Sequence, residues 1–206
     1  MHIEFIDLLR CPKPHEETWL VAALQRMDGR QVVEAKLGCP VCGAEFFIRD
    51  GVALFDGDDA LDGGTQPLGD EGVTRIAAFL NLTSPGKTVL LAGQLASASE
   101  SLSERADARV ISLNSSSRTK GTWSDRVAEL RAAPPLPLAA KSLDGIALDE
   151  SHSTPELLAE VAKLLRPRGR LLAGARADLS PEFRELARDS DHVVAECVGE
   201  LVTLRR

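Results

Sequence analysis

The cysteines and one histidine are the residues of this sequence best suited to chemistry. Cys39 and Cys42 are separated by two residues and followed by Gly43. At this spacing two thiolates can bind one metal ion, and the glycine lets the backbone turn around it. Cys11 lies in the same first 55 residues, with His15 four positions later. Because a tetrahedral zinc site needs four ligands, we predict zinc bound by Cys11, His15, Cys39 and Cys42.

Each of these residues also has a plainer interpretation. The thiols of Cys11, Cys39 and Cys42 are compatible with ordinary core cysteines. His15 is the weakest ligand, because Pro14 stands where a second cysteine of the early pair is expected. The alternative is a surface histidine, with the fourth position taken by water, by His2 or by nothing. The remaining cysteine, Cys197, lies in an apolar run and is predicted to be a core thiol.

A predicted hairpin connects the two halves of this ligand set. Residues 19–24 and 31–35 are apolar runs that flank a turn at Asp28-Gly29. Two metal-binding half-sites joined by a hairpin are typical of a zinc ribbon, here residues 1–55. A fold of this size gains little from its core, so the metal is expected to stabilise it. Loss of one cysteine ligand is expected to unfold residues 1–55 and to spare the rest of the chain.

Residues 56–72 are predicted to form an acidic, glycine-rich linker. They carry six of the acidic residues and no basic residue, in a chain of 206 residues with a net charge of −7. Such a composition buries too little apolar surface to fold, although an acidic docking or cation-binding segment is an alternative. No apolar run reaches the ~18 residues of a membrane helix, and the acidic N-terminus does not resemble a signal peptide. A cytoplasmic protein is therefore expected.

Residues 73–206 alternate between strand-like and helix-like patterns. Strands are predicted at 88–92, 109–113, 143–148 and 170–174, and helices at 73–80, at 154–166 and from Ser180-Pro181-Glu182 onward, with two closing strands around Gly199. A turn at 166–169 is expected to end the helix that begins at Thr154. This order predicts an α/β domain with a doubly wound, mostly parallel, Rossmann-like sheet.

The N-terminal motifs resemble a known family. Leu9-Arg10-Cys11-Pro12, Gly38-Cys39-Pro40-Val41-Cys42-Gly43 and Ile48-Arg49-Asp50-Gly51-Val52 are similar to the small zinc-ribbon proteins that activate tRNA, ribosomal and translation-factor methyltransferases. The resemblance covers about 50 residues and departs from the family at Pro14 and His15. It implies a module that holds a protein partner of methyltransferase fold and is not itself a catalyst.

The second half of the chain resembles another family. The segment Leu158 to Leu171, the preceding Leu136 to Asp144 and the closing antiparallel pair are similar to class I S-adenosylmethionine-dependent methyltransferases. These enzymes bind the methionyl end of their cofactor at a Gly-x-Gly-x-Gly loop after the first strand. Here Gly93 matches the first glycine, but Leu95 and Ser97 replace the others, and Asn114 replaces the acid that binds the ribose. The resemblance therefore implies a cofactor site that has lost its ligand contacts.

Two further polar groups have alternative interpretations. Glu150 or His152 could serve as a general base at a strand end, whereas the plainer hypothesis is a polar loop before a helix cap. The three arginines at 166, 168 and 170 could bind an anion, but around a turn they are expected to be solvated. Residues 73–206 carry eighteen basic and seventeen acidic residues, so nucleic acid is an improbable partner.

These patterns predict a non-catalytic zinc-binding scaffold or accessory subunit, a pseudo-methyltransferase that works in a complex with another protein chain. The alternative is an active methyltransferase with a divergent cofactor loop, and a third hypothesis is a nucleic-acid-binding ribbon with an inert companion domain. The ribbon is expected either to dock on its own C-terminal domain or to hold a second protein.

Overall fold

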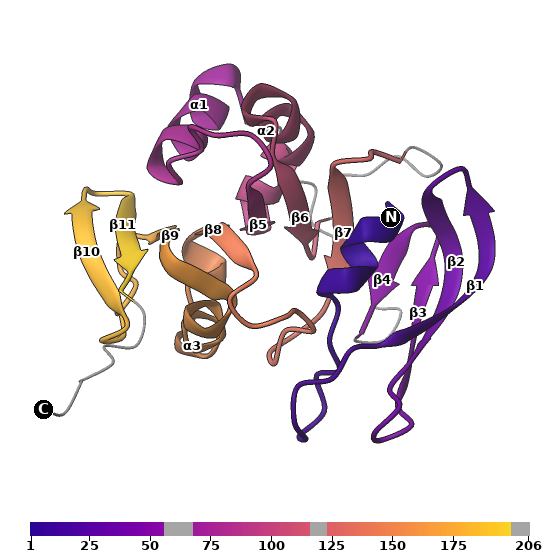
Figure 1. Ribbon diagram of the computed structural model, residues 1–206. Helices are drawn as coiled ribbons and strands as arrows, with labels where there is room; N and C mark the ends of the chain where they lie inside the picture. Colours follow the sequence, from indigo (N-terminus) through magenta and orange to yellow (C-terminus); the bar gives the residue numbers. More distant parts are fainter. Residues whose placement is uncertain (56–67, 116–122, 199–206) are drawn as a thin grey trace, which may run out of the picture.

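The computed structural model describes residues 1–55, 68–115 and 123–198. Within them all strands belong to one eleven-stranded sheet, in the order β1-β2-β3-β4-β7-β6-β5-β8-β9-β11-β10. Figure 1 shows this sheet running from the N-terminal hairpin at one end to the last two strands at the other. The N-terminal part, residues 1–55, and the C-terminal part, residues 68–198, therefore form a continuous structure.

The N-terminal part is an antiparallel meander preceded by a short helix. Its elements are η1 (Ile3–Leu8), β1 (Val21–Asp28), β2 (Gln31–Gly38), β3 (Glu45–Arg49) and β4 (Val52–Leu54). The predicted hairpin is β1 and β2, with Gly29 at φ +55° in the turn, a conformation that favours glycine. On the core face of β2 and β3, Leu37 and Ile48 are almost completely buried.

The C-terminal part alternates strands and helices before it ends in an antiparallel pair. Its elements are α1 (Asp70–Phe79), β5 (Thr88–Ala92), η2 (Gly93–Ala98), α2 (Ser99–Ala106), β6 (Arg109–Leu113), β7 (Val127–Arg131), β8 (Leu143–Leu148), η3 (Glu150–His152), α3 (Pro155–Leu164), β9 (Leu165–Gly174), β10 (Phe183–Arg188) and β11 (His192–Cys197). Strands β7, β6, β5, β8 and β9 are parallel, and β11 runs antiparallel to both β9 and β10.

Helices cover both faces of the parallel strands, as Figure 1 shows, which confirms the predicted doubly wound arrangement. Alternate residues of β5 belong to opposite layers: Val89 packs in the layer of α1 and α2, and Leu90 in the layer of α3. The layer of α3 also contains Phe5 and Leu37. The N-terminal part thus shares a hydrophobic core with the C-terminal part.

The N-terminal part docks on its own C-terminal part through a strand pairing and through loop contacts. Strand β4 pairs in parallel with β7, with Val52 opposite Glu129. In addition, η1 lies against the connection between β7 and β8, which contains no helix: the N–H of Arg10 donates to the carbonyl of Pro137 (2.9 Å), and the N–H of Ala139 donates to that of Leu8 (2.9 Å). Of the two expected arrangements, the structure therefore has the intramolecular one.

Three expectations differ from the structure. The helix expected from Ser180 onward is wrong, because residues 183–188 form β10, which pairs with β11 as the closing antiparallel pair. No separate turn follows α3, since β9 begins directly at Leu165 and Arg168 adopts a φ of +67° within it. Helix α1 begins at Asp70, inside the predicted linker, whereas linker residues 56–67 and Gly199 lie outside the described residues.

No helix in the described ranges is long and apolar enough to cross a membrane.

Candidate functional site

The four predicted metal ligands lie together in the structure. One ligand atom from each of Cys11, His15, Cys39 and Cys42 lies within 4.8 Å of all the others. The Sγ atoms of Cys11 and Cys42 are 3.7 Å apart, and Sγ of Cys39 is 3.4 Å from Nε2 of His15. Zinc bonds of about 2.3 Å to sulfur and about 2.0 Å to nitrogen in a tetrahedron separate two sulfurs by about 3.8 Å, and sulfur from nitrogen by about 3.5 Å. The donor set and its spacing therefore fit a metal ion of this kind.

Local backbone contacts hold the cysteines in place. At the end of β2, the N–H of Cys39 donates to the carbonyl of Ala44 (2.9 Å), and the N–H of Gly43 donates back to the carbonyl of Cys39 (3.0 Å). Gly43 has φ +70°, which allows this tight turn. On the other side, the N–H of Cys11 donates to the carbonyl of Thr18 (3.1 Å). Each half-site is thus held by backbone hydrogen bonds of its own.

His15 is oriented for ligation by its second ring nitrogen. Its Nδ1 donates to the carbonyl of Glu16 at 2.7 Å, which leaves the Nε2 lone pair directed at the thiols. This bond also raises the pKa of His15. Burial raises the pKa of the Cys11 thiol to about 11. For Cys39, the opposing effect of burial is outweighed by N–H donors of Cys42 and Val41, which lower its pKa to about 6. The cluster therefore contains one readily formed thiolate.

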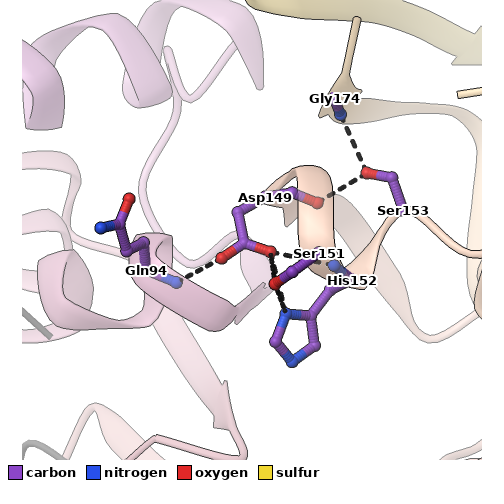
Figure 2. A network of polar contacts seen from close by, with 6 residues as sticks. All are labelled: Gln94, Asp149, Ser151, His152, Ser153 and Gly174. Carbon is purple, nitrogen blue, oxygen red and sulfur yellow. Dashed lines mark hydrogen bonds and ion pairs between the residues drawn. The ribbon is translucent and has the colours of Figure 1, made fainter. Parts of the chain in front are cut away.

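A second polar group lies at the carboxyl ends of β5 and β8, where open α/β sheets bind ligands. Asp149 follows β8, and its carboxylate accepts the N–H of Gln94 at 2.7 Å (Figure 2). Gly93, at φ +65°, lies so close that an added Cβ would stand 2.0 Å from Oδ2 of Asp149. The carboxylate of Asp149 therefore occupies the position against the first glycine of the expected cofactor loop.

The other expected cofactor contacts are also used within the chain. The hydroxyl of Ser97 donates to the carbonyl of Gln94 (2.8 Å), and Leu95 is buried. The side chain of Asn114 both donates to the carbonyl of Ala132 (2.9 Å) and accepts its N–H (3.0 Å). Each polar atom of Asn114 thus has one backbone partner and keeps one further donor or acceptor position. Ser97 and Asn114 are thus both engaged in hydrogen bonds within the chain.

His152 is held by the same carboxylate. Its Nδ1 donates to Oδ1 of Asp149 at 2.9 Å, and Ser151 donates its hydroxyl to that oxygen at 2.7 Å (Figure 2). These bonds and the N–H of Gln94 lower the pKa of Asp149 against the opposing effect of burial. The hydroxyl of Ser151 also lies 3.0 Å from Nδ1 of His152. Asp149 and Ser151 thus contact the same ring nitrogen, whereas a catalytic triad has the acid and the nucleophile on opposite nitrogens. Among the described residues, no hydrogen bond to Nε2 of His152 is seen.

The remaining candidates have structural partners. The loop after β8 is fixed by Ser153, whose hydroxyl donates to the carbonyl of Asp149 and accepts the N–H of Gly174. Glu150 lies 3.9 Å from the exposed Arg176. Of the three arginines, Arg166 is paired with Asp144 (3.3 Å) and Arg170 with Glu196 (3.5 Å), while Arg168 is exposed. They do not form an unpaired anion site.

Comparison with known proteins finds similar solved structures at low sequence identity. No protein-family model and no curated protein matches the chain. Several of the similar solved structures are methyltransferases. Geranyl diphosphate methyltransferase in complex with SAM is 17% identical over 50% of this chain and 47% of that one, with a TM-score of 0.40. Phosphoethanolamine N-methyltransferase 2 of Haemonchus contortus is 15% identical over 61% of this chain and 31% of that one, with a TM-score of 0.45.

A third similar structure is 1,6-didemethyltoxoflavin-N1-methyltransferase of Burkholderia thailandensis, 18% identical over 63% of this chain and 61% of that one, with a TM-score of 0.41. The chain spans less than half the length of the first two enzymes. In this chain the strands follow the order β7-β6-β5-β8-β9-β11-β10, with an antiparallel pair at the end.

Proposed function

We propose that the chain is a non-catalytic, zinc-binding accessory protein of methyltransferase fold that acts in a complex with another protein chain. The observation that carries this proposal is the closed cofactor position: the Asp149 carboxylate lies against Gly93 and is bonded to the N–H of Gln94. A ligand placed there would have to displace this charge-assisted hydrogen bond. The sequence of this domain retains the helix caps and buried strands that it needs to fold, but it lacks the residues that would bind the cofactor. This combination favours a protein that binds partners through its surface over one that binds a ligand in its pocket.

The metal centre supports a structural role. Cys11, His15, Cys39 and Cys42 supply four protein ligands and so complete a tetrahedral zinc site, whereas catalytic zinc sites keep one position for water or substrate. All four cysteines of the chain are free thiols, the state that ligation needs and that a reducing compartment maintains. We therefore also propose that the protein acts in the cytoplasm.

The position of the N-terminal part refines the proposed partner. The zinc-ribbon family that it resembles holds methyltransferase domains, and here β4 pairs with β7 of the same chain. The N-terminal part is thus already bound to a methyltransferase-like domain. A further protein chain would bind to other surfaces of the combined structure.

An S-adenosylmethionine-dependent methyltransferase with a divergent cofactor loop is the second candidate. The strand order favours it, and Nε2 of His152 lies near the strand ends, where a general base is useful. The methyltransferases among the similar structures fit this candidate better than the first, although a shared fold does not determine activity.

Calorimetric titration with S-adenosylmethionine separates the two candidates. We expect no binding with a dissociation constant below about 100 μM, roughly −5.5 kcal/mol, because the loop, the Asp149 contact and Asn114 each remove a different interaction. Sinefungin, a non-reactive analogue of the same shape, serves as a second ligand and excludes turnover as the cause of a missing signal. Tighter binding of either compound would establish the second candidate.

A further inference from the structure

The thiols of the Cys/His cluster differ in how far they are exposed to solvent. Cys11 and Cys39 are buried, with 8% and 4% of their surface exposed, whereas Cys42 is exposed. Cys42 follows Val41, which is 58% exposed, so this side of the cluster lies at the surface. Cysteines that react with oxidants in proteins are accessible and lie beside a second cysteine that can resolve the first product. Cys42 meets the first of these two conditions.

The second condition is met by Cys11. Its Sγ lies 3.7 Å from Sγ of Cys42, although the two residues are 31 positions apart in the sequence. A disulfide bond is about 2.0 Å long, so the two sulfurs need to approach each other by about 1.7 Å. Because Cys42 is exposed, rotation of its side chain between staggered positions meets little steric resistance. The pair is therefore close enough to form a bond after a small movement.

Cys39 is a less suitable partner, although it is nearer to Cys42 in the sequence. Its sulfur accepts the N–H groups of Val41 and Cys42 and lies 3.4 Å from Nε2 of His15. A bond between Cys39 and Cys42 would give up these contacts and would have to close within the tight turn that ends at Gly43. We therefore expect Cys39 to keep its place when Cys42 reacts.

A cavity beside the cluster gives a small oxidant a second route of approach. It has a volume of about 630 Å³ and lies between residues 10–17, residues 135–140 and the end of α3. Cys11 and His15 form part of its wall. Molecules of the size of hydrogen peroxide therefore approach the cluster from solvent at Cys42 and from this cavity at Cys11.

We propose that Cys11 and Cys42 form a reversible redox switch, in which a peroxide converts the two thiolates into a disulfide and the metal ion is released. Sγ of Cys42 attacks one oxygen of hydrogen peroxide, the O–O bond breaks, and the leaving hydroxide takes up a proton to become water. Sγ of Cys11 then attacks the sulfenic acid: the S–S bond forms, the S–O bond breaks, and a second hydroxide becomes water. Each sulfur loses one electron, and one peroxide is reduced to two waters.

The metal is released because two of its four ligands are lost. A sulfur in a disulfide is no longer a thiolate, the form that binds zinc. Of the four ligands, Cys39 and His15 remain, whereas structural zinc sites have four. The disulfide meanwhile keeps the two half-sites of the cluster connected. Thiol–disulfide exchange in a reducing compartment restores both thiolates, so the site can bind the metal again.

This inference rests on the metal site of the proposed function and adds a regulatory use to it. The proposed lack of methyltransferase activity has no bearing on it, since the thiols are the same in either case.

The test oxidises the full chain and locates the new bond. Zinc-loaded protein is treated with about one to ten equivalents of hydrogen peroxide, blocked with N-ethylmaleimide and digested with trypsin without reduction. Trypsin leaves Cys11 in the peptide 11–26 and both Cys39 and Cys42 in the peptide 37–49. We expect the two peptides to be joined, fragmentation to place the bond at Cys42, and a chromogenic chelator to detect one zinc released per bond. Dithiothreitol with added zinc should restore the full metal content.

The matched control is Cys197→Ala, which removes the thiol outside the cluster and should change neither the joined peptides nor the zinc release. A peptide 37–49 closed on itself, with Cys11 still free, would overturn the proposal. So would a bond from Cys11 to Cys39, oxidation to sulfinic or sulfonic acid without a disulfide, or a loss of metal that dithiothreitol does not reverse.

The zinc content before oxidation tests the metal site separately. Protein that contains zinc and forms no disulfide with peroxide would refute the switch and leave the metal site standing. Protein that contains no zinc but forms the bond between Cys11 and Cys42 would refute the metal site and uphold the thiol pair.

Discussion

Replacement of Cys39 by serine is expected to abolish stoichiometric zinc binding and to lower the melting temperature of the whole chain by at least about 10 °C. Structural zinc in small domains contributes roughly 10–16 kcal/mol of apparent binding free energy. Cys39 is buried in the same core layer as Leu90 and Ile146 of the central sheet. Loss of the metal should therefore also destabilise β7 and its neighbours through β4.

This expectation replaces the one drawn from the sequence, in which residues 1–55 unfold alone. Because β4 and β7 are neighbouring strands of one sheet, the two parts cannot unfold independently without breaking their pairing. Elemental analysis measures the zinc content, and calorimetry the melting temperature, of the unmodified chain and of Cys39→Ser. Cys197→Ala is the matched control: it removes a buried thiol outside the cluster and should leave one zinc per chain. Full zinc content and an unchanged melting temperature in Cys39→Ser would refute the assigned ligands.

Elements that are determined by residues close together in the sequence were predictable. β5 is a run of five buried residues, and the predicted strand 88–92 coincides with it. α3 begins where its cap chemistry places it: Thr154 accepts the N–H of Leu157 at 3.3 Å, and Pro155 occupies the first turn. The Cys/His cluster was predictable for the same reason. Cys39 and Cys42 are separated by only two residues, so they lie close together before any tertiary contact forms.

Elements that depend on distant partners were not predictable. The sequence Ser180-Pro181-Glu182 is a good helix start, yet the following residues pair with β11, and Arg184 meets Glu196 across the strands. Tertiary pairing outweighs local propensity there. β7 was missed because it is short and half-exposed, and its neighbour β4 comes from the N-terminal part.

The closed cofactor position illustrates the same limit. Leu95 and Ser97 reveal from sequence alone that the glycine pattern is lost. They do not reveal what takes its place, because Asp149 and Gln94 are 55 residues apart. The strand order brings β5 and β8 side by side, and only then does a carboxylate after one strand reach an N–H after the other.

A methyl group added at Gly93 is expected to destabilise the protein by roughly 2.5–5 kcal/mol. About 1–2 kcal/mol of this comes from a positive φ of +65° in a substituted residue. The remainder arises because the new Cβ displaces the Asp149 carboxylate and breaks its bond to the N–H of Gln94, a charge-assisted bond of about 1.5–3 kcal/mol. Chemical denaturation of Gly93→Ala measures the total.

Gly86→Ala separates the two contributions. Gly86 has φ +76°, and an added Cβ meets no atom within 4 Å, so this variant carries the backbone strain alone and should lose only about 1–2 kcal/mol. In an Asp149→Ala background, the further effect of Gly93→Ala should fall to that same value, because the carboxylate is no longer there to be displaced. If Gly93→Ala and Gly86→Ala lose equal stability in the unmodified chain, Asp149 does not fill the cofactor position. The case for a divergent but open methyltransferase site would then be the stronger one.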